Sequence, residues 1–247
     1  MKAEDLLYSS NYPLSEKRSW NSGVGFYERG EEGYPFDFEA SPDVLSALGH
    51  PFFPSLAIIS MQGEDEDRYA AWRLGLECAL NGISFSTNYS ARGVERVLCE
   101  GALEASGRIN LLLPGGIENF LDNRKRLSRI LLSDGCILSP FRTELPISWR
   151  NHLYNRSLLA HSSCALLLRM RRSEYDFAVE VLDNGGSLFL HRLALKDRYG
   201  RNLAMEGAPV IDSVVQILSA PVGYLHESTG GEFQFENYPP LSFLKLK

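Results

Sequence analysis

The sequence lacks any long hydrophobic run. No apolar segment of the 247-residue chain approaches the ~20 residues that a membrane-spanning helix needs. Residues 1–17 (MKAEDLLYSSNYPLSEK) contain acids and no apolar core, so we expect no secretory signal. We therefore expect a cytoplasmic protein that does not span a membrane.

Cysteine is scarce, and histidine shows no useful pattern. The cysteines lie far apart, at Cys78, Cys99, Cys136 and Cys164, which is typical of small buried residues in a reducing compartment rather than of disulfides or a metal site. The five histidines lack the spacing of metal ligands, and no serine lies in a G-x-S-x-G motif. We therefore expect no metal, no cofactor and no catalysis.

A net positive charge is also lacking. The formal net charge is −6, and such a field opposes the binding of nucleic acid phosphates. Basic residues are still grouped locally, at residues 124–129 and 169–172. Groups of this kind more often form a solvated surface than a ligand site, so we expect these arginines to face solvent.

The chain instead contains short apolar segments separated by segments of helix length. This alternation predicts an α/β fold, a Rossmann-like, doubly wound and mostly parallel sheet. We expect six strands, at Leu56–Ser60, Ile83–Thr87, Ile109–Leu113, Cys136–Leu138, Cys164–Leu168 and Ser187–Leu190. The domain is expected at residues 34–218, with short extensions at residues 1–33 and 219–247.

The periodicity between these strands predicts helices. In Asp65–Asn81 we expect the buried face to contain Tyr69, Trp72, Leu76 and Leu80. A second helix should bury Val94, Val97, Leu98, Gly101, Ala102 and Ala105, and end where Ser106-Gly107 supplies a left-handed residue. Further helices are expected at Phe120–Leu132, Ser148–Ala160, Glu174–Asp183 and Ile211–Leu218, and loops at Tyr34–Pro54 and Gly200–Ala208. A short edge strand is expected at Phe233-Gln234-Phe235.

Two glycine-bearing loops follow neighbouring strands. The loops are Asn88–Gly93 and Pro114–Glu118, and loops after parallel strands share one edge of a sheet. Arg92 presents a planar fork suited to phosphate, Gly93 permits a positive φ and close approach, and the following helix adds amide donors. We therefore expect both loops to open into one binding pocket.

Several segments in order resemble the DprA/Smf family. The match is best at residues 88–95 (NYSARGVE), 98–103 (LCEGAL), 106–109 (SGRI) and 114–116 (PGG). It continues at residues 41–49 (SPDVLSALG), 155–162 (NRSLLAHS), 200–203 (GRNL) and 206–208 (EGA). Members of this family are Rossmann-like bacterial factors that bind single-stranded DNA and load the recombinase during natural transformation.

The chain also departs from the family pattern. The GSR motif after the first strand is replaced by Ser60-Met61-Gln62, which removes an arginine, and the SG before ARG is replaced by Asn88-Tyr89. A family histidine is replaced by Cys99. The apolar strands persist while loop residues differ, so we expect DNA binding to be weakened.

The resemblance implies a site for nucleic acid or phosphate. The expected contacts are Arg92, Gly93, Gly115, Gly116, Asn155 and Arg156, with Trp149 or Tyr154 nearby to stack a base. The implied partners are single-stranded DNA, a recombinase and a second copy of the chain. Two other interpretations stay open, namely a module that binds a nucleotide or small ligand at the two loops, and a scaffold that kept the fold and a protein partner.

Pro114-Gly115-Gly116 also resembles part of the PGG-x-GT-x-x-E signature of the cytokinin-riboside phosphoribohydrolases. Here PGG is followed by Ile117-Glu118-Asn119-Phe120, so the GT pair and the spaced glutamate are missing. We interpret Glu118 as an acid that complements a helix N-terminus rather than as a catalytic residue. If the protein released free base from a nucleoside monophosphate, this would support the interpretation of the chain as such a phosphoribohydrolase.

Overall fold

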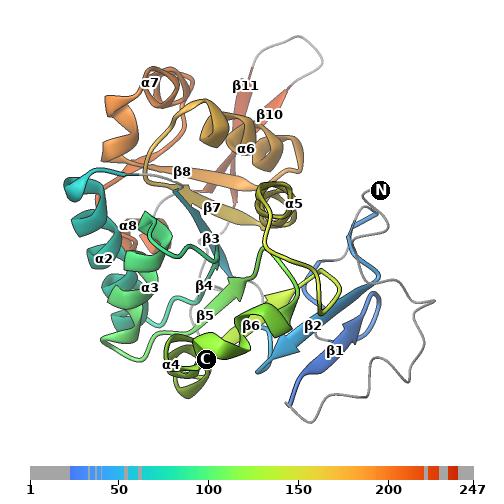
Figure 1. Cartoon of the computed structure of the whole chain (residues 1–247). Helices are drawn as coiled ribbons and strands as arrows, with labels where there is room; N and C mark the ends of the chain where they lie inside the picture. The colour runs from blue at the N-terminus through green and yellow to red at the C-terminus, as the bar shows by residue number, and fades with distance from the viewer. Residues whose placement is uncertain are drawn as a thin grey trace.

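A mixed β-sheet forms the centre of the molecule (Figure 1). The computed structural model describes residues 23–32, 34–36, 38–39, 41–52, 55–60, 63–219, 222–227 and 233–238. Within these residues the sheet has nine strands in the order β1-β2-β6-β5-β4-β3-β7-β8-β9. They are β1 Gly25–Glu28, β2 Val44–Leu48, β3 Leu56–Ile59, β4 Phe85–Asn88, β5 Ile109–Leu112, β6 Cys136–Ser139, β7 Cys164–Leu167, β8 Ser187–His191 and β9 Val210–Ile211.

Neighbouring strands are parallel throughout the run β6-β5-β4-β3-β7-β8-β9. β2 pairs antiparallel with β6, and β1 pairs antiparallel with β2. The helical elements are α2 Asp65–Leu80, α3 Val94–Leu103, the 3-10 helix η2 Ile117–Asn123, α4 Arg124–Leu132, α5 Trp149–Ala160, α6 Arg172–Asp183, the 3-10 helix η3 Arg192–Lys196, α7 Arg198–Met205 and α8 Val215–Ser219. A separate antiparallel pair is formed by β10 Val222–Glu227 and β11 Phe233–Tyr238, where a strand was expected.

Helices cover both faces of the sheet (Figure 1). Leu56 and Ile58 of β3 belong to the core under α2, α3, α4 and α8, whereas Ala57 and Ile59 belong to the core under α5, α6 and α7. This alternation is expected of a strand whose successive side chains point to opposite faces. The predicted Rossmann-like α/β fold is confirmed.

The number of strands was underestimated. β2 lies in Tyr34–Pro54, which we expected to be a loop, and all five of its residues are buried. The prolines and aromatic residues of the surrounding segment obscured the pattern of this five-residue strand. The strand also contains the polar residue Ser46, whose hydroxyl donates to the Ser139 carbonyl at 3.1 Å. β1 lies in residues 1–33, which we expected to be an extension, and β9 has two residues, too few for a hydrophobic pattern.

Two helix predictions need correction. Gly200–Ala208, expected as a loop, lies mostly in α7, and the region expected as one helix at Ile211–Leu218 contains the end of β9 and then α8. In α2, Tyr69 and Leu80 are 66% and 70% exposed, and the helix instead buries small residues. A Cβ added to Gly75 would lie 2.0 Å from the Leu98 carbonyl oxygen, so α2 and α3 approach too closely for large side chains.

The prediction for the second helix holds at most positions, and the helix ends where expected. α3 buries Val94, Leu98, Gly101 and Ala102, and Ser106 takes the left-handed backbone after it, with a φ of 54°. The cysteines are all buried and none is in a disulfide. Among the described residues no helix is long and apolar enough to cross a membrane, and no cluster of three or more potential metal ligands is found.

Candidate nucleic-acid interface at the carboxyl edge of the sheet

The strand order identifies where a doubly wound sheet usually binds its ligand. From β3 the chain proceeds outward through β4, β5 and β6, and then returns to β7 on the other side of β3. The switch point therefore lies between the carboxyl ends of β3 and β7, where open α/β sheets form their binding crevices. The two predicted loops follow β4 and β5, so they share this edge, as expected.

The Asn88–Gly93 loop exposes its arginine. The Arg92 side chain is exposed, and its guanidinium makes no hydrogen bond with the described residues, while its carbonyl accepts from Nη2 of Arg68 at 3.2 Å. Gly93 is the N-cap of α3, with a φ of −79°, and its N–H donates to Oγ of Ser90 at 2.7 Å. Gly93 therefore does not adopt the positive φ that glycine permits, and the Arg92 side chain faces solvent.

The Pro114–Glu118 loop is covered by the segment 142–147. Gly115 and Gly116 are both buried, and the Gly116 N–H donates to the Leu145 carbonyl at 2.7 Å. A Cβ added to Gly116 would lie 2.0 Å from the Thr143 carbonyl oxygen. These glycines thus allow one backbone to pack on another. The loop is closed, and the expectation that both loops open into one pocket is wrong.

Asn155 and Arg156 are also buried, with 0% and 4% exposure. Asn155 Nδ2 donates to the Leu113 carbonyl at 3.0 Å, which ties α5 to the end of β5. Arg156 Nη2 donates to the Ser173 carbonyl at 2.7 Å, and its guanidinium carbon lies 5.7 Å from the centre of the Phe177 ring. Both side chains therefore connect the elements at this edge rather than present donors to solvent.

Arg156 also lies near two buried acids, Glu95 and Glu174. Burial lowers the pKa of Arg156, whereas the neighbouring Glu174 and Glu95 raise it. Burial raises the pKa of Glu95 to about 8, and the charge of Arg156 and a hydrogen bond with the Ser60 backbone oppose this rise. Arg156 thus lies close to Glu95 in the first turn of α3 and to Glu174 in the first turn of α6.

Arg169, which we expected to face solvent, is buried beside the switch point instead. It lies just after β7 and is 7% exposed. Its Nη1 lies 3.1 Å from Oδ2 of Asp67 in α2, and its Nε lies 2.8 Å from Oδ2 of Asp197, the N-cap of α7. The charged hydrogen bonds raise the pKa of Arg169 and lower that of Asp197. An arginine directly after a buried central strand is the signal that could have indicated this role.

An exposed aromatic lies beside the closed loop. Trp149, the first residue of α5, is 56% exposed, and its neighbour Arg150 is exposed. The helix is anchored there because Asn151 Nδ2 donates to the Pro114 carbonyl at 2.9 Å. Tyr154, the other aromatic predicted to stack a base, is partly buried and packs edge-on against Phe141, with ring centres 5.8 Å apart.

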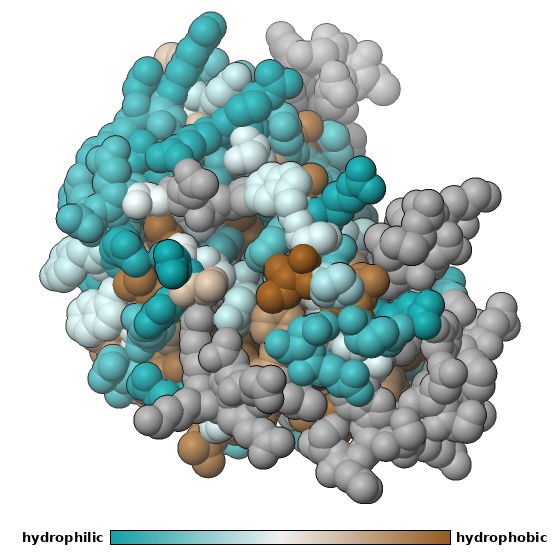
Figure 2. Space-filling view, in the orientation of Figure 1, coloured by the Kyte–Doolittle hydropathy of each residue, from teal (hydrophilic) through white to brown (hydrophobic). Residues whose placement is uncertain are grey.

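Apolar side chains accompany Trp149. Ile147 is 53% exposed and Leu153 44%. Figure 2 shows hydrophobic surface in the region of the segment that leads to α5, with hydrophilic surface around it. We refer to Arg92, Trp149 and Arg150 as the edge surface.

The fold and this edge define a doubly wound, Rossmann-like α/β protein. No family model matches the sequence, and no curated protein matches it. Among solved structures it is similar to DNA processing protein A (DprA) from Streptococcus pneumoniae, with 17% identity, a TM-score of 0.67, and coverage of 80% of this chain and 74% of that chain.

It is also similar to DprA from Helicobacter pylori, whose structure was described for its single-stranded DNA binding mode. There the identity is 20%, the TM-score 0.62, and the coverage 78% of this chain and 93% of that chain. The resemblance predicted from the sequence is thus confirmed at the level of the fold, which is DprA-like.

Proposed function

We propose that this protein is a divergent DprA-like factor that binds single-stranded DNA weakly along the edge surface. The observation that carries the proposal is the exposure of Trp149 beside Arg150, at the same edge of a DprA-like fold as the exposed Arg92. An exposed aromatic ring can stack a base of any sequence, while arginines contact the backbone phosphates. The net charge of −6 works against tight binding.

The proposal divides the predicted site residues into two groups. Arg92 remains a candidate phosphate contact. The other four residues hold neighbouring segments together at this edge of the sheet, namely Gly115, Gly116, Asn155 and Arg156. This division follows from their burial and from bonds to carbonyls of neighbouring segments. The replacement of the family's GSR arginine concerns Gln62, which lies outside the described residues.

The further parts of the proposal follow from the family resemblance. They are a role in DNA processing linked to natural transformation, a recombinase partner, a homodimer, a cytoplasmic location and the absence of catalysis. The test for a recombinase partner is whether the protein speeds assembly of a recombinase filament on DNA. Sedimentation of the protein alone tests the dimer.

Fluorescence anisotropy with labelled oligo-dT tests the DNA binding. We expect binding that weakens as salt rises, with a slope of log K against log salt of about −1 to −2, because two arginines each displace counterions at about 0.7 per phosphate. A duplex of the same length is the control and should bind less, since its bases are stacked. Absence of binding at low salt, or a slope of zero, would refute the proposal.

The nucleotide module has less support. Its second loop is closed by residues 142–147, and its glycine N–H at Gly116 already donates to Leu145. A rise in melting temperature with a nucleoside monophosphate, together with no change on addition of single-stranded DNA, would favour the nucleotide-binding module instead. Absence of both responses would favour the scaffold.

A further inference from the structure

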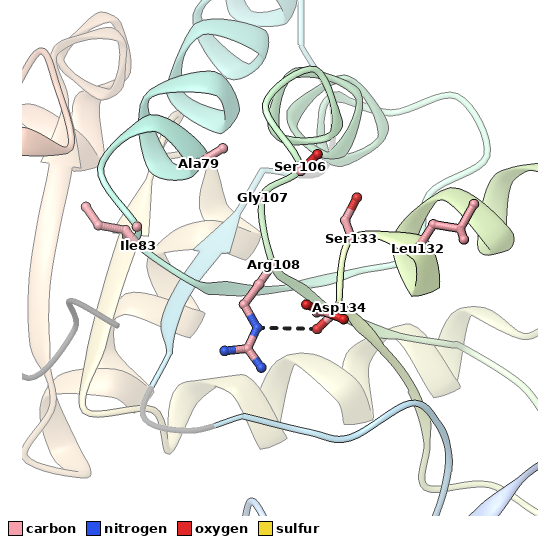
Figure 3. A pocket seen from close by; sticks show the side chains of 9 residues that line it. Ala79, Ile83, Ser106, Gly107, Arg108, Leu132, Ser133 and Asp134 are labelled. Atoms are coloured by element: carbon pink, nitrogen blue, oxygen red, sulfur yellow. Dashed lines mark hydrogen bonds between the residues drawn. The ribbon is translucent and has the colours of Figure 1, made fainter. Parts of the chain in front are cut away.

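A pocket of about 230 Å³ opens at the opposite, amino-terminal edge of the sheet (Figure 3). It lies between the ends of α2, α3 and α4 and is lined by Ala79, Gly82, Ile83, Ser106, Gly107, Arg108, Leu132, Ser133 and Asp134. It is separate from the edge surface, because the helices that begin at the carboxyl edge end here. None of the functions considered above uses it.

Three helix C-termini converge on this pocket. α2 ends at Leu80, α3 at Leu103 and α4 at Leu132, and Figure 3 shows the hollow between these ends. The C-terminus of a helix carries a partial negative charge, about half of an elementary charge, which favours a cation. Neither α2 nor α3 has a basic residue in its last turn, whereas α4 has Arg129, which lies 4.0 Å from Glu104 at the C-cap of α3.

A carboxylate adds to this negative potential. Asp134 is exposed at the pocket, and its backbone has a φ of 54°, in the left-handed region that asparagine and aspartate tolerate. Ser106, on the facing wall, has the same φ and is also exposed. The carboxylate and this hydroxyl are hydrogen-bond acceptors on two sides of one hollow.

The one cation among the lining residues is held at the wall. Arg108 Nε donates to the Asp134 carbonyl at 3.4 Å, and its guanidinium carbon lies 4.5 Å from the centre of the Phe52 ring. In Figure 3 its side chain points away from Ser106 and Ala79. The stacking on Phe52 orients the arginine, which leaves the space between the helix ends to another group.

We propose that this pocket binds a small aliphatic amine in its ammonium form. The ammonium donates to the Asp134 carboxylate in the field of the ends of α2 and α3, and the carbon chain lies in the hollow lined by Ala79, Gly107 and Ser133. A pocket of this size accommodates a chain of a few carbon atoms. An anion of the same length is repelled by the same carboxylate and helix ends.

Titration of the whole protein with 1,4-diaminobutane, followed by the backbone NMR signals of residues 79–83, 106–108 and 132–134, tests this proposal. We expect saturable shifts confined to these residues, and none with succinate, which has the same carbon chain length and the opposite charge. Shifts of equal size with succinate, or shifts spread over all acidic surfaces, would overturn it.

A matched pair of variants identifies the carboxylate. Asp134→Asn keeps a residue suited to the left-handed backbone and removes the charge, so we expect binding about tenfold weaker, the value of one charged hydrogen bond. Asp183→Asn removes an exposed carboxylate from the C-terminus of α6, outside the pocket, and should leave the affinity unchanged. Unchanged affinity in Asp134→Asn would refute the assignment, and oligo-dT binding measured on the same variants shows whether the edge surface is unaffected.

Discussion

Arg169 and Asp197 form a two-point ion pair, with Nε 2.8 Å from Oδ2 and Nη2 3.1 Å from Oδ1. The same guanidinium reaches Asp67, so one buried cation links the end of β7 to the starts of α2 and α7. These buried charges lie beside the switch point, where a Rossmann-like protein often holds its ligand.

Arg169→Met should therefore be strongly destabilising. It leaves Asp67, which is 0% exposed, without its cation, and removal of one partner from a buried pair typically costs about 3–5 kcal/mol. Urea denaturation measures the loss in the free energy of unfolding. Arg172→Met is the control, because the Arg172–Asp176 pair is 78% and 63% exposed and should contribute less than about 1 kcal/mol. Equal effects of the two substitutions would contradict the buried role of Arg169.

Gly116→Ala tests the closed loop. Its Cβ would lie 2.0 Å from the Thr143 oxygen and 2.1 Å from the Arg142 oxygen, and both are backbone atoms that cannot rotate away. We expect a loss of about 3 kcal/mol or more in the free energy of unfolding, since overpacking costs this much when the neighbours are rigid. Gly25→Ala is the control, because nothing lies closer than 3.9 Å to its added Cβ. A stable Gly116→Ala protein would mean that residues 142–147 do not cover the loop.

The sequence predicted the parts of the fold that depend on hydrophobic pattern. Two of the central parallel strands are Ile109–Leu112, which is apolar except for Asn110, and Cys164–Leu167. A strand that is buried on both faces is a nearly continuous apolar run, and such a run is easy to recognise in a sequence. β2 was missed since its five residues follow a loop rich in proline and aromatic residues. α2 was predicted correctly as a helix, yet its buried face was wrong, because contact through Gly75 is a tertiary property.

The site was predicted less well than the fold. The sequence placed Arg92 and the two loops at one edge, because strand order and direction determine that edge. It could not show that residues 142–147 cover Gly116, or that Arg156 turns inward toward Ser173, because both depend on contacts between distant segments. The same holds for Arg169, whose partners Asp67 and Asp197 are distant in sequence.

Glu95 should make stability depend on pH. Its pKa in the folded protein is about 8, above the ordinary 4.5, so its contribution to stability is fully present below pH 4.5 and is lost as the pH rises through 8. Glu95→Gln cannot ionise, and the free energy of unfolding of this variant relative to the wild type should rise by a few kcal/mol between pH 5 and pH 9. Urea denaturation at several pH values measures this difference.

Other groups that titrate in this range do not disturb the comparison. Burial lowers the pKa of His152 and His191, but both are present in the variant and in the wild type. Glu100→Gln, in the same helix with a partly exposed side chain, should keep the wild-type dependence. A pH dependence that is the same in Glu95→Gln as in the wild type would show that Glu95 ionises normally.

Trp149→Ala should weaken the binding of oligo-dT if the exposed ring stacks a base. Aromatic stacking contributes about 1–3 kcal/mol per base, which corresponds to a loss of affinity of about 5- to 150-fold. Leu153→Ala is the matched control, since Leu153 lies one turn further along α5 and is 44% exposed. Fluorescence anisotropy measures both, and equal losses would indicate a general apolar contact rather than stacking.

Arg92→Ala should change the salt dependence of DNA binding rather than the fold. The side chain is exposed and makes no hydrogen bond within the described residues, so the free energy of unfolding should change by less than about 0.5 kcal/mol. If Arg92 contacts a phosphate, the slope of log K against log salt should become less negative by about 0.7.

Arg129→Ala is the control, because Arg129 is also exposed but lies in the last turn of α4, at the other edge of the sheet. Since both variants change the net charge equally, an identical effect on the slope would reflect the overall field, whereas an effect of Arg92→Ala alone would locate the phosphate at the start of α3.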